Sequence, residues 1–281
     1  MADEPLPGAL RETRTEVPEA IPAATVILLR DGPDGLETLM LRRNSKLEFA
    51  GGMWVFPGGR VDPEDYPADA PDDVEAAVRV AAAREAQEEA GLACDPEAMV
   101  PFSHWTPPMV AIKRYATWFF VTEAPAGAVT IDDGEIHESV WARPEDTLAR
   151  RDAGEVELAP PTWVTLDRLS RSATVAEALD EARSAPVEAF VTAIGKDGDD
   201  LVALWHGDAG YETGDASAPG PRHRLVMSNT NPWRYDRDCR SPSFWLRDRA
   251  PRRTIPQPEA DVGRHTPWGG CGHERASGND C

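Results

Sequence analysis

Apolar runs separated by glycine- and proline-rich turns dominate the first half of the chain. Residues 23–30 read Ala-Ala-Thr-Val-Ile-Leu-Leu-Arg, a nearly continuous apolar run that predicts a buried β-strand. A glycine- and proline-containing turn at 31–35 and the apolar segment 36–42 predict its hairpin partner. Other apolar runs predict strands at 53–56, 115–122 and 137–142, with a weaker one at 129–131.

Alanine dominates the segment after Val74, which predicts an α-helix that Asp72 or Asp73 caps and that Gly91 ends. At about 100° per residue, one face of this helix holds apolar side chains. Glutamates fall on the same face, three and four residues apart. The apolar members are Val74, Ala77, Val78, Ala81 and Leu92, and the glutamates are Glu85, Glu88 and Glu89.

These three carboxylates need a cation if they are half buried together. Like charges repel one another, and burial adds a desolvation cost for each of them. A hard divalent ion with oxygen ligands, such as Mg²⁺, answers both problems. The turn 56–59 (Phe-Pro-Gly-Gly) precedes the helix and allows a close approach of the backbone. The three glutamates are therefore candidate metal ligands, and the alternative is an ordinary acidic helix face in water.

The second half of the chain changes character at Pro144. Residues 144–150, 161–169 and 175–185 predict three helices, the last two starting at Thr162 and Thr174. Segments 190–194 and 201–205 predict a strand pair, and 224–227 predicts a third strand. Strands mixed with helices in this order favour an α+β fold.

The segment from Arg84 to Leu92 resembles the Nudix box, whose pattern is G-x5-E-x7-R-E-U-x-E-E-x-G-U with U a bulky apolar residue. Gly59 takes the place of its first glycine. The pattern puts 13 residues between this glycine and the arginine, whereas 24 residues (60–83) intervene here. An insertion of about 11 residues therefore splits the box. Counted back from the arginine, the first glutamate of the pattern falls on Ala76.

The resemblance implies an α/β/α sandwich around a mixed sheet and a Mg²⁺- or Mn²⁺-dependent hydrolase. It adds the carbonyl of Gly58 to the metal ligands Glu85, Glu88 and Glu89, and it makes Arg84 a brace for the carboxylates. In such enzymes a further carboxylate comes from a loop before a strand that bears Trp. Glu135, six residues before Trp141, is the first candidate for this ligand or general base, and Glu138 is the second. His104 and His137 stay outside the catalytic set, because a lone histidine is more often packed or solvated.

The split box is similar to the branch that includes peroxisomal coenzyme A diphosphatases. Further segments agree with this branch: Arg43, 49–52, 105–107, 114–115, 119–120 and 158–162. A coenzyme A signature aligns in spacing from Leu39 to Gly59, but its arginine and histidine fall on Glu48 and Ala50. Coenzyme A or an acyl-coenzyme A is therefore one candidate substrate, beside ADP-ribose, NADH and nucleoside triphosphates. The candidate substrate-binding residues are Arg43, Arg60 and Arg114.

The formal net charge of −20 argues against a nucleic-acid duplex or an anionic membrane as the main partner. A small diphosphate substrate remains compatible, since a bound metal and local arginines reverse the potential at a site. No apolar run approaches the length of a membrane span, and the first 20 residues lack a secretory apolar region. The four cysteines are irregularly spaced. We expect a cytoplasmic protein.

The composition divides the chain into four parts. Residues 1–19 predict a flexible arm, 20–150 the catalytic core, 151–235 an extension packed on the core, and 236–281 a disordered tail. The extension could alternatively form a homodimer surface. In the tail, Cys271 lies near His265 and His273, but the spacing fits no usual zinc motif.

Two classes of function remain open beside a plain acidic scaffold. The leading class is a Nudix hydrolase that cleaves a diphosphate linkage. The competing class is a non-catalytic Nudix-fold sensor that binds a nucleotide metabolite. Sensors commonly lose the box glutamates, whereas all three are present here, which favours the enzyme. The absence of phosphate-loop, dinucleotide-binding and serine-nucleophile motifs disfavours other classes of enzyme.

Overall fold

The computed structural model describes residues 20–46, 50–111, 114–132, 134–238 and the backbone of 245–246. The predicted N-terminal arm lies outside these residues, as do most of the predicted tail and its cysteine–histidine cluster. Within the described residues, no helix is long and apolar enough to cross a membrane.

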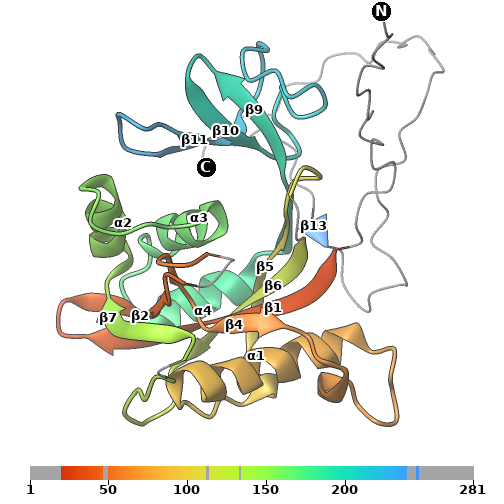
Figure 1. The fold of residues 1–281 in the computed structure, drawn as a ribbon, viewed down its shortest axis with the longest axis vertical. Helices are drawn as coiled ribbons and strands as arrows, with labels where there is room; N and C mark the ends of the chain where they lie inside the picture. The colour runs from red at the N-terminus through yellow and green to blue at the C-terminus, as the bar shows by residue number, and fades with distance from the viewer. Residues whose placement is uncertain (1–19, 47–49, 112–113, 133, 239–244, 247–281) are drawn as a thin grey trace, which may run out of the picture.

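A mixed sheet forms the centre of the molecule (Figure 1). Its strand order is β13-β8-β5-β6-β1-β2-β3, with β4 paired to β1 and β7 paired to β2. β1 lies parallel to β6 and antiparallel to β2, and β8 lies parallel to β5. The strands are β1 (Ile21–Gly32), β2 (Gly35–Arg43), β3 (Trp54–Val55), β4 (Gly58–Arg60), β5 (Val100–Thr106), β6 (Tyr115–Glu123), β7 (Ile136–Ala142), β8 (Val187–Val191) and β13 (Trp245–Leu246).

Strand β1 is buried on both faces of the sheet, which explains its continuous apolar sequence. Val26 and Leu28 belong to the core cluster that also contains the alanines of α1 (Val74–Ala90). Ile27 and Leu29 belong to the larger cluster on the opposite face. Successive side chains of a strand point to opposite faces, so one strand supplies both cores.

Helices cover both faces of this sheet. Helix α1 lies on one side, while α3 (Pro160–Leu169) and α4 (Val175–Ser184) lie on the other, beside α2 (Pro144–Asp152) (Figure 1). Short 3₁₀ helices occur at Pro63–Asp65 and Pro96–Ala98. This arrangement confirms the predicted α+β fold with an α/β/α sandwich, and the α3 and α4 helices contribute to the second core.

A second sheet lies C-terminal to the helices, in the order β12-β11-β10-β9. A buried ion pair ties its connecting loop to it: Arg224 donates to Asp208 at 2.6 and 2.7 Å, and Asp208 also accepts from the His223 amide at 2.9 Å. The sheet packs on the sandwich through Trp205, which lies edge-on to Trp105. Its strands are β9 (Ala193–Asp197), β10 (Asp200–Leu204), β11 (His223–Met227) and β12 (Arg234–Arg237).

Some predicted elements differ from the structure. Residues 129–131 form no strand. The predicted strand 190–194 spans the end of β8 and the start of β9, and of these two strands it is β9 that pairs with β10. Helix α3 begins at Pro160 rather than at Thr162, because proline fits the first helical turn. The sequence analysis missed strand β5, because Pro101 and His104 interrupt its apolar pattern. In the predicted tail, 236–237 belong to β12 and 245–246 pair with β8.

His104 is a packed residue of β5, which agrees with its exclusion from the catalytic set. Its ring lies 5.0 Å from that of Trp118 and is almost fully buried. Burial disfavours the charged imidazolium and lowers the pKa of His104 to about 4.

This buried histidine makes folding stability depend on pH. Between about pH 6.5 and 4, His104 binds a proton in the unfolded chain but not in the folded chain. The contribution of the neutral His104 to folding stability is therefore present above pH 6.5 and is lost on acidification. At ~1.4 kcal/mol per pKa unit, we expect the loss to be about 2 kcal/mol at pH 5 and to approach about 3 kcal/mol near pH 4. Urea unfolding at pH 7.5, 6.0 and 5.0 measures it in wild type and in His104→Phe. Equal pH slopes in the two proteins would contradict this expectation.

Candidate active site

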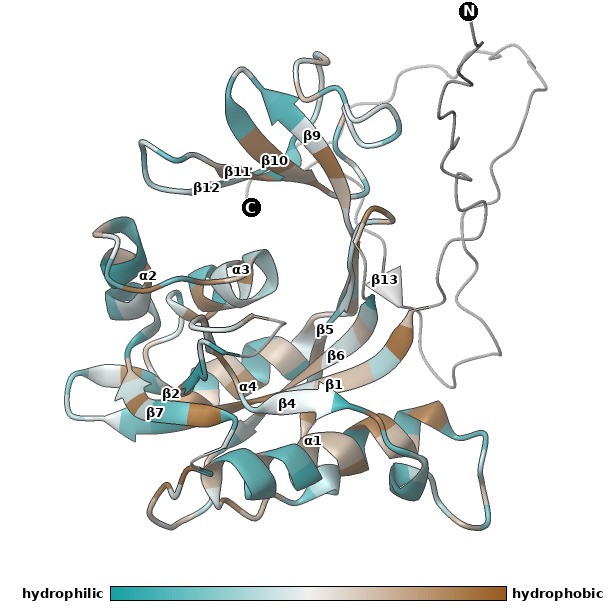
Figure 2. Ribbon diagram, viewed as in Figure 1, coloured by the Kyte–Doolittle hydropathy of each residue, from teal (hydrophilic) through white to brown (hydrophobic). Residues whose placement is uncertain are grey.

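The C-terminal half of α1 carries the three glutamates of the box. The Asp73 carboxylate accepts from the Ala76 amide at the start of the helix, and Gly91 ends it with a φ of 70°. The first half of α1 has hydrophobic colours in Figure 2, and the half with the glutamates is largely hydrophilic. The buried face is continued by Ala82, Ala86, Glu89 and Ala90.

The glutamates differ in burial, which corrects the expectation that all three share the buried face. The side chains of Glu89 and Glu85 are only 6% and 14% exposed, whereas that of Glu88 is 58% exposed. The apolar stripe follows the alanines, so it passes Glu85 and Glu89 and leaves Glu88 at the edge. Two carboxylates, not three, are therefore largely withdrawn from water.

Glu89 lies against Gly58 and Gly59, the predicted turn, which in the structure forms the start of strand β4 and is called the glycine turn below. Its Oε2 atom accepts a hydrogen bond from the Gly58 amide at 3.0 Å, and its Oε1 atom lies 3.6 Å from Arg43 Nη1. Burial, together with the charges of Glu85 and Glu135, raises the pKa of Glu89 to about 8, against the opposing effects of the Gly58 hydrogen bond and of Arg43. A carboxyl group whose charged form is disfavoured in this way marks a place where added positive charge is stabilising.

Glu85 approaches the next residue of the turn. A Cβ atom at Gly59 would lie 2.6 Å from Glu85 Cδ, so no other residue fits there without moving this carboxylate. Burial is also the largest cause that raises the pKa of Glu85, and Arg84 opposes it. The Gly58–Gly59 turn is therefore a surface without side chains onto which two buried carboxylates fit.

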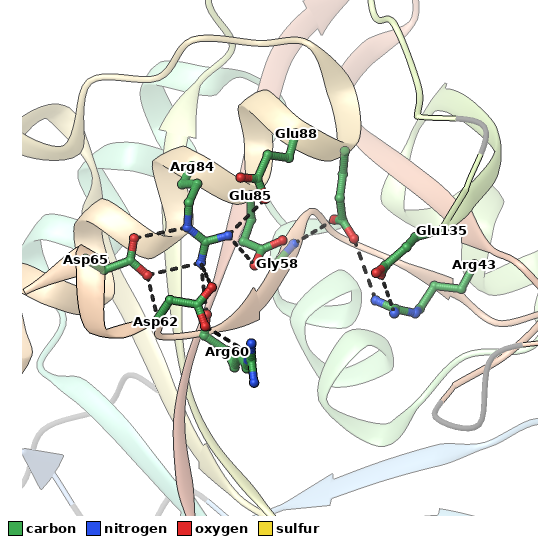
Figure 3. A network of polar contacts seen from close by, with 10 residues as sticks. Arg43, Gly58, Arg60, Asp62, Asp65, Arg84, Glu85, Glu88 and Glu135 are labelled. Carbon is green, nitrogen blue, oxygen red and sulfur yellow. Dashed lines mark hydrogen bonds and ion pairs between the residues drawn. The ribbon is translucent and has the colours of Figure 1, made fainter.

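Arg84 connects the helix to the segment before the insertion. Its Nη1 atom donates to Glu85 Oε1 and Glu88 Oε2, both at 2.9 Å. Its Nε and Nη2 atoms donate to the two oxygens of Asp65, both at 3.0 Å. Figure 3 shows the guanidinium between these groups. Its neighbours, first among them Asp65, raise the pKa of Arg84, so it stays charged. Arg84 thus contacts two of the three box glutamates and Asp65 together.

Asp65 is a site residue that the sequence analysis missed. Five residues (60–64) separate it from Gly59, the spacing of the first glutamate in the box when counted forward from the glycine. Counting back from Arg84 pointed to Ala76 instead, which is the wrong position because the additional residues lie after Asp65. Asp65 is 3% exposed at its side chain and also accepts from the Asp62 amide at 2.8 Å. The forward count was the available signal.

The three candidate substrate arginines have different surroundings. Arg43, at the end of β2, contacts two carboxylates, with Nη2 donating to Glu135 Oε2 at 3.0 Å. Arg60 is exposed, pairs with Asp62 at 2.9 Å, and its carbonyl accepts from Arg84. Arg114 is buried, 3% exposed, with Nη2 placed 3.4 Å from the Pro107 carbonyl. The structure brings Arg43 and Arg60 to the box residues (Figure 3).

Glu135 belongs to the same group of charges. Its side chain is 57% exposed and meets Arg43 across from Glu89. Glu138, the second candidate, lies on β7 opposite Arg42 and pairs with it at 3.5 Å. His137 is exposed between them. Among the described carboxylates of this loop, Glu135 is the one that the structure places beside a box glutamate through a shared arginine.

The donor set suits a hard divalent cation, since it offers carboxylates from one helix face next to the half-buried backbone of Gly58 and Gly59. In the described residues, no three acidic, histidine or cysteine side chains already converge at metal-binding distance. Their oxygens are directed to Arg84, Arg43 and the Gly58 amide instead. The residues fit a metal in charge and kind of ligand, and binding would require rotation of the glutamate side chains.

Comparison with known proteins identifies the class. The NUDIX domain family matches residues 20–162. A comparison with curated proteins finds no match. Among solved structures, a NUDIX hydrolase from Alicyclobacillus acidocaldarius is 24% identical and has a TM-score of 0.52, with 58% of this chain and 96% of that chain covered. The NUDIX domain of Shewanella oneidensis NrtR, complexed with ADP ribose, is 15% identical, with 54% and 86% covered and a TM-score of 0.41.

The family match covers more than half of the chain, so the chain belongs to the Nudix family. It is a Nudix pyrophosphohydrolase, of a family that acts on nucleoside diphosphate derivatives and generally uses a divalent metal such as Mg²⁺. The Alicyclobacillus structure shows the shared fold.

The Asp65–Arg84 contact generates a test. Asp65→Ala removes the two carboxylate oxygens that accept from Nε and Nη2 of Arg84, so the guanidinium loses its orientation toward Glu85 and Glu88. We expect kcat to fall about 10- to 100-fold, as for other residues that orient metal ligands. Steady-state kinetics measures it, with Glu64→Ala on the same 3₁₀ turn as the control. Wild-type kcat in a folded Asp65→Ala protein would contradict this role.

Proposed function

We propose that the chain hydrolyses a diphosphate linkage in a nucleoside diphosphate-linked metabolite, with Mg²⁺ or Mn²⁺ bound by the box glutamates. The observation that carries the proposal is the burial of Glu85 and Glu89 together against the Gly58–Gly59 turn. Two buried carboxylates need compensating positive charge, which Arg84 and Arg43 supply in part and a divalent cation would complete. The arrangement therefore supports a cation site rather than an acidic surface.

The roles follow from position. Glu85, Glu88 and Glu89, with the Gly58 carbonyl, would hold the metal, which activates water and neutralises charge on the diphosphate. Arg84 orients Glu85 and Glu88 through the hydrogen bonds described above. Glu135 is solvent-accessible beside Glu89, so it can accept a proton from water or add a ligand. Arg43 and Arg60 supply positive charge for the phosphates of the substrate.

Coenzyme A or an acyl-coenzyme A is the first substrate candidate, because the split box is similar to coenzyme A diphosphatases. The insertion lies between Asp65 and α1, where it leaves the Asp65–Arg84 contact intact. ADP-ribose, NADH and nucleoside triphosphates are the other candidates. Arg114 is buried, so it is a candidate for binding the substrate only if the substrate displaces its side chain from this position.

Substitution of single glutamates tests the metal site. We expect Glu88→Gln and Glu89→Gln each to lower kcat by about 100-fold or more, because each removes a charge that binds the metal. Glu88 is the cleaner test, since its exposed side chain contributes little to packing. Glu75→Gln, an exposed acid in the first turn of the same helix, is the matched control. Unchanged turnover in both variants would refute the assignment.

A panel of diphosphates tests the substrate. Product release is measured from coenzyme A, an acyl-coenzyme A, ADP-ribose, NADH and a dNTP mixture, each with Mg²⁺, with Mn²⁺ and with EDTA. We expect metal-dependent cleavage of one class and none in EDTA. Cleavage that persists in EDTA would contradict the metal requirement. Binding of a panel member without cleavage would favour the sensor.

A further inference from the structure

The strand that carries Glu135 into the site contains an irregularity. Along β2 and β7, Arg42 is paired with Glu138, but Arg43 is paired with Ile136. His137 is therefore an additional residue on β7, as in a β-bulge, which redirects the side chains on its two sides. Ile136 is fully buried while His137 and Glu138 are exposed. The bulge brings the residue before Ile136 level with the end of β2.

Asn44, the residue after β2, holds this end of the loop in two places. Its backbone amide donates to the Glu135 carbonyl at 2.7 Å. Its side-chain Nδ2 atom donates to the Gly134 carbonyl at 3.1 Å. Its Oδ1 atom accepts from the Lys46 amide at 3.0 Å, which fixes the orientation of the amide group. Asn44 therefore binds the carbonyls of two successive peptide units, those of Gly134 and Glu135.

Two further contacts complete the support of Glu135. Asp132 Oδ1 accepts from the amides of Glu135 and Ile136, both at 3.1 Å. Arg43, the neighbour of Asn44, binds the Glu135 carboxylate and faces Glu89. The exposed Glu135 side chain has little packing to hold it, so its place beside Glu89 depends on these polar contacts.

We propose that Asn44 is a positioning residue, which holds Glu135 beside Glu89 for the hydrolytic reaction. The proposal rests on the proposed function, because that function makes Glu135 a proton acceptor or an additional metal ligand. Asn44 acts through the backbone of the loop and needs no contact with the substrate. A residue that fills space alone would tolerate an isosteric change, whereas a donor to the Gly134 carbonyl does not.

The experiment is a double-mutant cycle with Asn44→Ala and Glu135→Gln. We expect Asn44→Ala to lower kcat about 10-fold, in the range found for groups that orient catalytic ligands, with a smaller change in KM. In the Glu135→Gln background it should lower kcat no further, because the residue that it positions is already inactive. Asn44→Asp keeps the shape and loses the donor, so its kcat should fall as in Asn44→Ala. Asn231→Ala, an exposed asparagine of the β11–β12 turn, is the control.

Hydrogen exchange gives a readout that does not need activity. The amides of 134–137 should exchange faster in Asn44→Ala than in wild type, and Asn231→Ala should leave them unchanged. The proposal would be overturned if Asn44→Ala lowered kcat as much in the Glu135→Gln background as in wild type. Full activity of Asn44→Asp, or unchanged exchange of the amides of 134–137 in Asn44→Ala, would also overturn it. If wild type cleaves no diphosphate, the proposed function fails, and exchange still decides whether Asn44 holds the loop.

Discussion

Two carboxylates buried side by side are the constraint around which this site is organised. Glu85 and Glu89 lie on or beside the apolar face of α1, where desolvation and mutual repulsion act against the charged forms. Such groups persist only with compensating partners. The structure supplies them as a backbone amide from the glycine turn and two guanidinium groups, and the local sequence requirements follow from that arrangement.

The compensating cations come from separate parts of the chain and so join them. Arg84 shares the helix with the glutamates, but its orientation is set by Asp65, in the segment that follows the glycine turn. Arg43 comes from the end of β2 and links Glu89 to Glu135. The hairpin, the glycine turn and the helix are thereby held in one network of charges. The insertion after Asp65 lengthens the chain and leaves this network of charges intact.

The C-terminal part completes the sandwich that supports the site. Helices α3 and α4 cover the sheet face opposite α1, which allows β1 to be apolar on both sides. The second sheet is attached through aromatic rings, because Trp205, which follows β10, lies edge-on to Trp105 of β5 at 5.6 Å and to Phe190 of β8 at 5.3 Å. Arg237 from β12 also donates to the buried Glu188 of β8 at 2.8 Å. The packing of β5 and β8 therefore involves residues far from them in sequence.

The sequence alone determined the central hairpin, helix α1 with its caps and the box glutamates, because each depends on local periodicity and on residues close in sequence. It also identified Glu135 and Arg84 as candidates. Tertiary structure decided the rest. The unequal burial of Glu88 and Glu89 depends on which side of α1 meets the sheet, and Asp65 is recognised by its contact with Arg84. Strand β5 and the His137 bulge depend on partners distant along the chain, since pairing and register are set by tertiary contacts that no local pattern contains.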